Sequence, residues 1–156
     1  MATAFETLLQ ALGAALEMDL APAADGIAEV AIGPRAVCLK PVAQETTLRL
    51  FTTVQSPLTP ASEQLPSEVL ARALRRNLFA EQTAGHVIGL FNQTLIVSVD
   101  LPLEALSAEE LAERLLLIAR VAEEAEVDLF GSEGSAPAAS EPAAEPAPEM
   151  MAFLRA

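Results

Sequence analysis

Histidine and cysteine are the side chains most often used for catalysis and metal binding, and this chain has one of each, His86 and Cys38. A structural zinc site takes four nitrogen or sulfur ligands, so these two cannot build one without carboxylate help. His86 stands at the start of an expected strand, just after a helix stop, which favours a surface or hydrogen-bonded structural role. Cys38 lies between Val37 and Leu39 in an expected strand, which indicates a small core-like residue. The pair predicts neither a metal site nor a catalytic nucleophile.

Carboxylates and glycines are the next candidates for chemistry. The carboxylates lie on expected helix faces and in turns, with no apolar pocket pattern that would raise their pKa values. Gly26, Gly33, Gly85 and Gly89 are isolated, so no glycine-rich phosphate loop is present. We therefore expect no catalytic residue, no metal and no cofactor, and we do not predict an enzyme.

Three arginines form a local basic patch on an expected helix: Arg72, Arg75 and Arg76. A solvated helix face would explain them, and so would a contact with an acidic partner surface. The pattern leaves both interpretations open.

The overall charge is strongly negative, with a net charge of −13. Residues 1–130 carry 8 basic and 18 acidic side chains, a balance of −10. That balance argues against nucleic acid, whose phosphates require clustered Lys and Arg, and against an anionic membrane surface. It favours a basic or neutral protein as partner.

The location expected from the sequence is the cytoplasm. No apolar run approaches the roughly 20 residues of a membrane span, and Glu6 interrupts what could have been a secretory signal. A single cysteine fits a reducing compartment. The length of 156 residues and the apolar share of 52% predict one domain with a real core.

The N-terminal half predicts a helix followed by three strands. Thr3 and Glu6 fit a capping box, and the helix after them places Phe5, Leu8, Leu9, Leu12 and Leu16 on one face. The expected strands are Ile27–Ile32, Ala36–Val42 and Thr47–Gln55. Their alternation predicts an antiparallel sheet with one covered side.

The next segment predicts a helix over Ser67–Ala84 and a hairpin of His86–Phe91 and Leu95–Leu101, joined through Asn92-Gln93-Thr94. The apolar residues of this helix recur at three- and four-residue steps: Val69, Leu70, Ala73, Leu74 and Leu78. A helix and a hairpin of this size cannot bury both their apolar sides alone. The surplus apolar surface indicates a protein that binds other polypeptides.

A second capping box, Ser107 with Glu110, opens a helix that we expect to end near Asp128. Three regions follow from this pattern: a domain over 1–130, an Ala/Pro/Glu-rich linker over 131–149 that we expect to be disordered, and an apolar segment over 150–156. The apolar Met150–Leu154 cluster is either a frayed end or a peptide that docks on its own domain, on a second copy or on another protein.

The fold class is thus α+β: helix, three strands, helix, two-strand hairpin, helix, with a twisted antiparallel sheet flanked by helices. Over residues 3–129 this order resembles the class I type III secretion chaperones, typified by the Tir and YopE chaperones of Gram-negative bacteria. The stretches that carry the resemblance are Phe5–Gly13, Val69–Phe79, His86–Leu90 and Leu101–Leu111.

The resemblance implies a non-enzymatic homodimer that binds the N-terminal region of a secreted effector in extended form and keeps it ready for export. It also implies the export ATPase of the secretion apparatus as a partner. By the corresponding elements, the implied dimer interface is Leu70, Leu74, Leu78, Phe79, Val87 and Leu90. The implied effector-binding residues are Phe5, Leu9, Leu12, Leu50, Phe51 and Ile96.

Two other hypotheses compete with this one. An adaptor or regulatory subunit of a secretion complex would use the same fold to bind a folded protein. A small α+β enzyme would require an activity that is lost when His86 or Cys38 is replaced.

Overall fold

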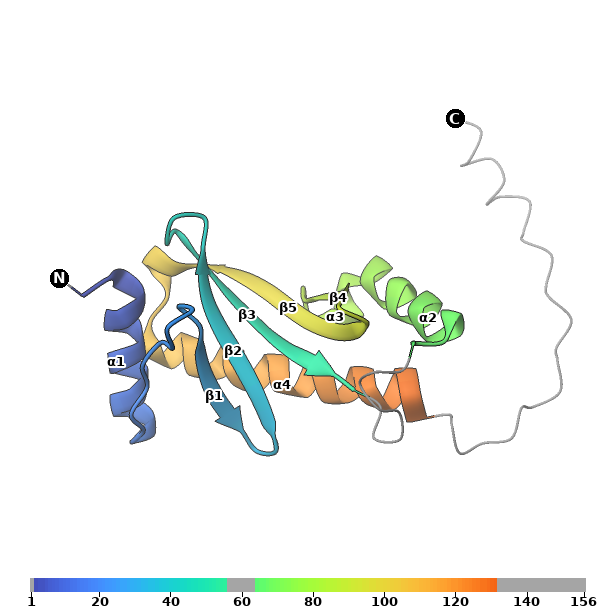
Figure 1. The fold of residues 1–156 in the computed structure, drawn as a ribbon, viewed down its shortest axis with the longest axis horizontal. Coiled ribbons are helices and arrows are strands. Elements are labelled where there is room, and N and C mark those ends of the chain that lie inside the picture. Colours follow the sequence, from blue (N-terminus) through green and yellow to red (C-terminus); the bar gives the residue numbers. More distant parts are fainter. Residues whose placement is uncertain (1, 56–63, 132–156) are drawn as a thin grey trace, which may run out of the picture.

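The computed structural model describes residues 2–55 and 64–131 (Figure 1). Its elements are α1 (Ala4–Leu16), β1 (Ala28–Ile32), β2 (Arg35–Val42), β3 (Thr47–Val54), α2 (Ser67–Leu78), α3 (Ala80–Thr83), β4 (Val87–Phe91), β5 (Thr94–Pro102), a 3₁₀ turn (Leu103–Ala105) and α4 (Ala108–Phe130). The expected α+β class and element order are confirmed. The expected linker beyond Gly131 and the Met150–Leu154 cluster lie outside the described residues.

The five strands form one antiparallel sheet in the order β1-β2-β3-β5-β4, so β1 and β4 are its edges. In Figure 1, α4 runs along one face of this sheet, α1 crosses near the start of α4, and α2 lies over its C-terminal end. The sheet therefore has one face covered by helices and one face opposite α4.

The core lies between α4, α1 and the covered face of the sheet. Strand β3 shows the alternation most clearly, because Leu48, Leu50, Thr52 and Val54 are all buried. The buried line expected along α4 is confirmed: Leu111, Leu115, Ile118, Ala122 and Ala125. Packing of this kind, at roughly 1.5–3 kcal/mol for each fully buried large side chain, supplies most of the driving force for the fold.

Both capping boxes form as expected. The Thr3 hydroxyl accepts the Glu6 amide at 3.2 Å, and the Glu6 carboxylate accepts the Thr3 amide at 2.8 Å. Ser107 and Glu110 repeat the pattern at the start of α4, at 3.2 Å and 3.0 Å. The hydrogen bonds that the Ser107 amide and hydroxyl donate to the Glu110 carboxylate lower the pKa of that carboxyl. The two helix starts are thus fixed by local sequence alone.

The helix expected over Ser67–Ala84 is interrupted, and this corrects the prediction. Helix α2 ends at Leu78, Phe79 takes an extended conformation, and the single turn of α3 follows. Positive φ angles of 48° at Ala84 and 81° at Gly85 then turn the chain into β4. The β4–β5 hairpin closes through Asn92 and Gln93, whose φ angles of 46° and 63° suit a two-residue turn.

Candidate protein-binding surfaces

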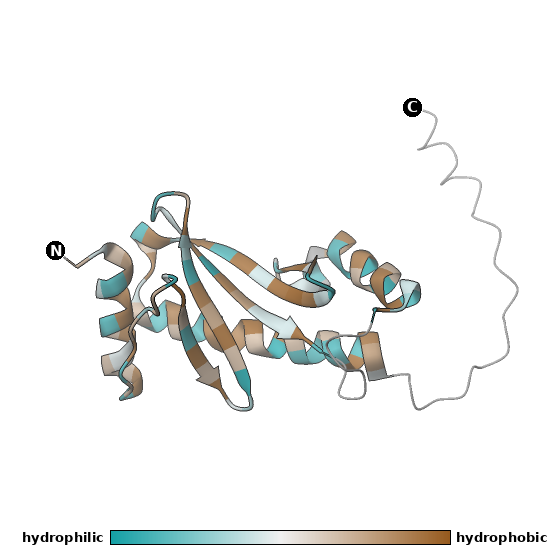
Figure 2. Cartoon of the chain, viewed as in Figure 1, coloured by the Kyte–Doolittle hydropathy of each residue, from teal (hydrophilic) through white to brown (hydrophobic). Residues whose placement is uncertain are grey.

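Large apolar side chains stand in solvent on α2, on the residue after it and on β4. We call this set the α2–β4 face: Leu74, Leu78, Phe79, Val87, Leu90 and Phe91. Each of the six is 55–77% exposed. Figure 2 shows hydrophobic bands along α2 among its polar residues. Soluble monomers rarely leave a contiguous apolar patch of this kind uncovered, so the face points to a protein partner.

Helix α2 buries few apolar side chains, and polar contacts hold it in place beside β4. The Asn77 amide nitrogen donates to the Ile88 carbonyl at 2.7 Å, and the Asn77 amide oxygen accepts the Ile88 N–H at 2.8 Å. On the other side, the buried Arg76 guanidinium pairs with Asp128 of α4. These contacts hold α2 by its inner side and leave Leu74 and Leu78 facing outward.

The residues predicted for a dimer interface therefore lie on α2, on the residue after it and on β4, although Val87 and Leu90 point to opposite faces of that strand. Five of the six are exposed, and Leu70 is half-buried against the core. Sequence reasoning missed Phe91. Its two-residue spacing from Gly89 and Val87 puts it on the same side of β4, which was the available signal.

A second candidate surface is the sheet face opposite α4. Phe51 of β3 and Ile96 of β5 are half-buried there, and Cys38 and Ser98 flank Phe51 in register. One step along the strands, Arg49 and Asp100 form a two-pronged ion pair, both N–O distances being 2.7 Å. The pairing lowers the pKa of Asp100 and raises that of Arg49. The face thus presents an apolar centre beside a pair of opposite charges.

Four of the residues predicted to bind an effector lie in the core, which corrects that part of the prediction. Phe5, Leu9, Leu12 and Leu50 are 0–3% exposed. Their side chains pack in the single apolar cluster that includes α1, α4 and the sheet. They therefore offer no apolar surface to another chain in this structure, and Phe51 and Ile96 are what remains of the predicted set.

His86 and Cys38, the two residues considered for catalysis or metal binding, both occupy defined positions in the fold. His86 is only 3% exposed, and its Nδ1 lies 2.8 Å from the Thr83 carbonyl oxygen and 3.2 Å from that of Ala84. Since carbonyls only accept, Nδ1 carries the proton and holds the turn before β4 together. Burial lowers the pKa of His86.

Cys38 differs from its expected place, because Val37 and Leu39 point into the core and Cys38 points to the opposite side, half-buried. Burial, with Glu29 and Asp25 nearby, raises the pKa of its thiol. A raised pKa disfavours the thiolate that nucleophilic chemistry would need. Within residues 2–55 and 64–131, no three His, Cys, Asp or Glu side chains gather as a metal site would require.

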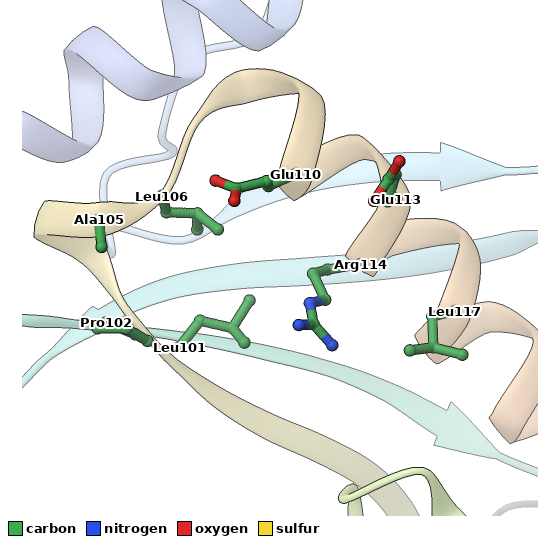
Figure 3. Close-up of a pocket in the computed structure, with 8 residues that line it drawn as sticks. All are labelled: Leu101, Pro102, Ala105, Leu106, Glu110, Glu113, Arg114 and Leu117. Carbon is green, nitrogen blue, oxygen red and sulfur yellow. The ribbon is translucent and has the colours of Figure 1, made fainter.

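A hollow of about 510 Å³ lies between the end of β5, the 3₁₀ turn and α4 (Figure 3). In Figure 3 the Arg114 side chain extends from α4 toward Leu101, with Leu106 and Leu117 on either side. Glu110 and Glu113 line its rim. The lining is apolar with mixed charge, which suits a side chain of another polypeptide better than a reaction.

Among the helices of the described residues, none has the length and hydropathy of a membrane span.

Comparison with known proteins identifies a matching family and solved structures of similar fold. A sequence model of the Tir chaperone protein (CesT) family matches residues 7–126. No curated protein sequence gives a significant match.

Solved structures of similar fold include a chain of the HopA1–SchA chaperone–effector complex, with a TM-score of 0.62 and 22% identity over 79% of this chain and 93% of that one. A chain of the ExoT–SpcS complex from Pseudomonas aeruginosa gives 0.57 and 17%, over 80% and 98%. One from the complex of the Yersinia pestis type III secretion chaperone SycH with a YscM2 fragment gives 0.57 and 22%, over 75% and 95%.

Proposed function

This chain belongs to the Tir chaperone protein (CesT) family, and we propose that it is a type III secretion chaperone that binds the N-terminal region of a secreted effector in extended form. The resemblance predicted from the sequence is confirmed by the family match. The observation that carries the proposal is the pair of uncovered surfaces, one on α2 and β4 and one on the sheet face opposite α4.

The proposed dimer forms through the α2–β4 face. Leu74 and Leu78 are among the most exposed large apolar residues of the described chain, and a second copy would remove them from water. A two-fold interface brings the same patch from both copies together, so each apolar residue of the patch is buried in both copies. Leu70, Phe79, Val87 and Leu90 complete this proposed interface, and Phe91 extends it.

The proposed effector contacts lie on the open sheet face and its free edge. Phe51 and Ile96 supply apolar contacts near the centre of the face. At the edges, Asn77 already bonds the outward N–H and carbonyl of Ile88 in β4, whereas β1 pairs with β2 alone. Strand β1 is therefore the edge better able to add an extended segment through backbone hydrogen bonds.

An extended ligand loses much chain entropy when it becomes ordered, so small contacts must accumulate over a large area. Dimerisation supplies that area, because two linked copies engage one chain at two places. No turnover of ATP is needed for this holding role. We propose that the protein acts without catalysis in the cytoplasm of a Gram-negative bacterium. It delivers the bound effector to the secretion apparatus, and the export ATPase of that apparatus is a proposed further partner.

The test is capture of partners from the native host by the full-length chain. We expect secreted proteins to be the main co-purified species, retained through their N-terminal regions. The double variant Phe51→Glu/Ile96→Glu should reduce their recovery about tenfold or more, because it places charge in an apolar contact.

The matched control is Leu116→Glu, which changes an exposed leucine of α4 outside both surfaces. It should leave recovery unchanged. Equal recovery with the double variant and with the control would contradict the assignment of the open sheet face.

A second candidate, an adaptor that binds a folded protein, is favoured by one observation. The α2–β4 face spans a helix and a strand that the Asn77–Ile88 hydrogen bonds join, which would also suit a folded partner. Co-purification of a folded, non-secreted subunit in place of secreted proteins would support the adaptor.

A further inference from the structure

The hollow between the end of β5, the 3₁₀ turn and α4 is separate from the two surfaces used in the proposed function. Its volume of about 510 Å³ lies within the range of ligand sites in proteins, roughly 300–1,000 Å³. None of the residues that line it belongs to the α2–β4 face, and neither Phe51 nor Ile96 is among them. The hollow is therefore a third candidate contact for another polypeptide.

Apolar side chains form the interior of the hollow. Leu101 is buried, and Leu106 and Leu117 are half-buried against the same core. The Arg114 side chain extends from α4 toward Leu101 (Figure 3). An aliphatic side chain placed in this space would leave water to pack against leucines and against the carbon stem of the arginine.

The rim of the hollow is acidic. Residues 104–113 carry no basic side chain and four glutamates, all of them exposed: Glu104, Glu109, Glu110 and Glu113. Two of these, Glu110 and Glu113, line the hollow itself. In Figure 3 the Glu113 carboxylate points away from the leucines, whereas the Arg114 guanidinium points toward them. The local charge thus favours a cationic side chain at the rim.

The two rim carboxylates differ in their hydrogen bonding. The Glu110 carboxylate accepts the Ser107 amide at 3.0 Å and the Ser107 hydroxyl at 2.9 Å, so the capping box already engages it. The Glu113 carboxylate has no hydrogen bond or ion pair among residues 2–55 and 64–131. Arg114 is adjacent in sequence and so does not face Glu113 on the helix. Glu113 is therefore the rim carboxylate that is open to a cation from a partner.

Resting on the proposed chaperone function, we propose that this hollow binds an extended segment of the effector in which an aliphatic residue lies two positions from a lysine or arginine. Side chains two residues apart point to the same side of an extended chain, so both face the chaperone. The aliphatic side chain enters the hollow. The cation stays at the rim beside Glu113, because the Arg114 guanidinium repels a second positive charge inside.

The test is an NMR titration of the full ¹⁵N-labelled chain with a blocked pentapeptide, acetyl-Ala-Leu-Ala-Lys-Ala-amide. We expect amide shifts at residues 105–106, 110–114 and 117, with a dissociation constant on the order of 1 mM for so small a ligand. Replacing the lysine of the probe by glutamate should weaken binding about threefold. Replacing its leucine by alanine should weaken binding at least about tenfold, because the apolar contact is lost.

Charge reversal in the chain tests the assigned carboxylate. Glu113→Lys should weaken binding of the lysine probe about threefold and make the glutamate probe the tighter of the two. Glu123→Lys makes the same charge change at an exposed position of α4 outside this hollow. It is the matched control and should keep the preference for lysine.

Equal binding of the lysine and glutamate probes would overturn the proposal, and so would a Glu113→Lys variant indistinguishable from Glu123→Lys. Shifts centred on the α2–β4 face or on the open sheet face would also overturn it. A chain that retains secreted proteins but shows no shifts around the hollow at about 5 mM probe, several times the expected constant, would refute this inference and leave the proposed function intact. Shifts around the hollow in a chain that captures no secreted protein would support the preference of the hollow and contradict the proposed function.

Discussion

The amide side chain of Asn77 takes the place beside Ile88 that a neighbouring strand would occupy. It satisfies both the N–H and the carbonyl of Ile88, at 2.8 Å and 2.7 Å, in a half-buried setting. Through these two bonds the proposed dimer helix is joined to the edge strand beside it.

Asn77→Ala should lower the free energy of unfolding by about 1–3 kcal/mol, because two backbone groups lose their partners. Urea unfolding measures this value, and faster hydrogen exchange at the Ile88 amide would locate the effect. Gln10→Ala, at an exposed position of α1, is the control and should stay within about 0.5 kcal/mol of the parent chain. If both variants unfold alike, the bonds to Ile88 do not hold α2.

His86 gives the protein a defined pH dependence. Its pKa is lowered in the folded state, chiefly by burial. The unfolded chain therefore binds the proton first as the pH falls, and stability decreases from about pH 6.5, the ordinary histidine value, down toward the folded pKa. No other histidine is present in the sequence, so this window is free of competing imidazoles.

The urea midpoint of the parent chain should fall between pH 7 and pH 5.5, and that slope should be smaller in His86→Gln, which keeps a donor for the Thr83 carbonyl. Unfolding curves at three pH values provide the measurement. An unchanged slope in the variant would show that the imidazole does not set this dependence.

At the scale of elements, α2 tests the proposed dimer. Leu74→Glu/Leu78→Glu should weaken self-association at least about 100-fold, because charge replaces apolar contacts on both copies. The variant should still fold, since both side chains are exposed. Light scattering at micromolar concentration should report monomers, and circular dichroism should report an unchanged fold.

Leu116→Glu is again the matched control and should remain dimeric. A double variant that associates as well as this control would mean that the interface lies on another face.

Local sequence patterns predicted the helices and strands. They did not predict which apolar residues lie in the core and which are exposed. Phe5, Leu9 and Leu12 form a helical stripe with steps of four and three residues, and Leu70, Leu74 and Leu78 form one with steps of four. Periodicity predicts that a stripe is covered but does not identify what covers it. In the structure the chain's own core covers the first stripe and leaves most of the second exposed.

The local sequence also did not predict the break between α2 and α3 at Phe79. The apolar spacing runs through Phe79 without a stop signal. The contacts that hold α2 are nonlocal, since Arg76 pairs with Asp128 and Asn77 with Ile88. Asp128 is 52 residues from Arg76, and Ile88 lies in the next strand, so the amphipathic pattern of the helix alone does not contain this information.

At the scale of the whole molecule, the acidic chain combines a closed core with uncovered apolar faces. The core includes most of the large side chains of α1, α4 and the inner face of the sheet. Of the ten large apolar residues that are exposed in the described chain, six lie on α2, at Phe79 and on β4. Negative charge keeps such a molecule soluble while those faces are free. This combination suits a protein that holds another chain without changing it.

The most direct measurement is native mass spectrometry of the complex purified from the host, followed by hydrogen exchange on the bound partner. We expect two copies of this chain with one secreted protein, and protection of the partner's N-terminal region only in the complex. One copy alone, or a partner whose N-terminal region is equally protected when free, would contradict the proposed function.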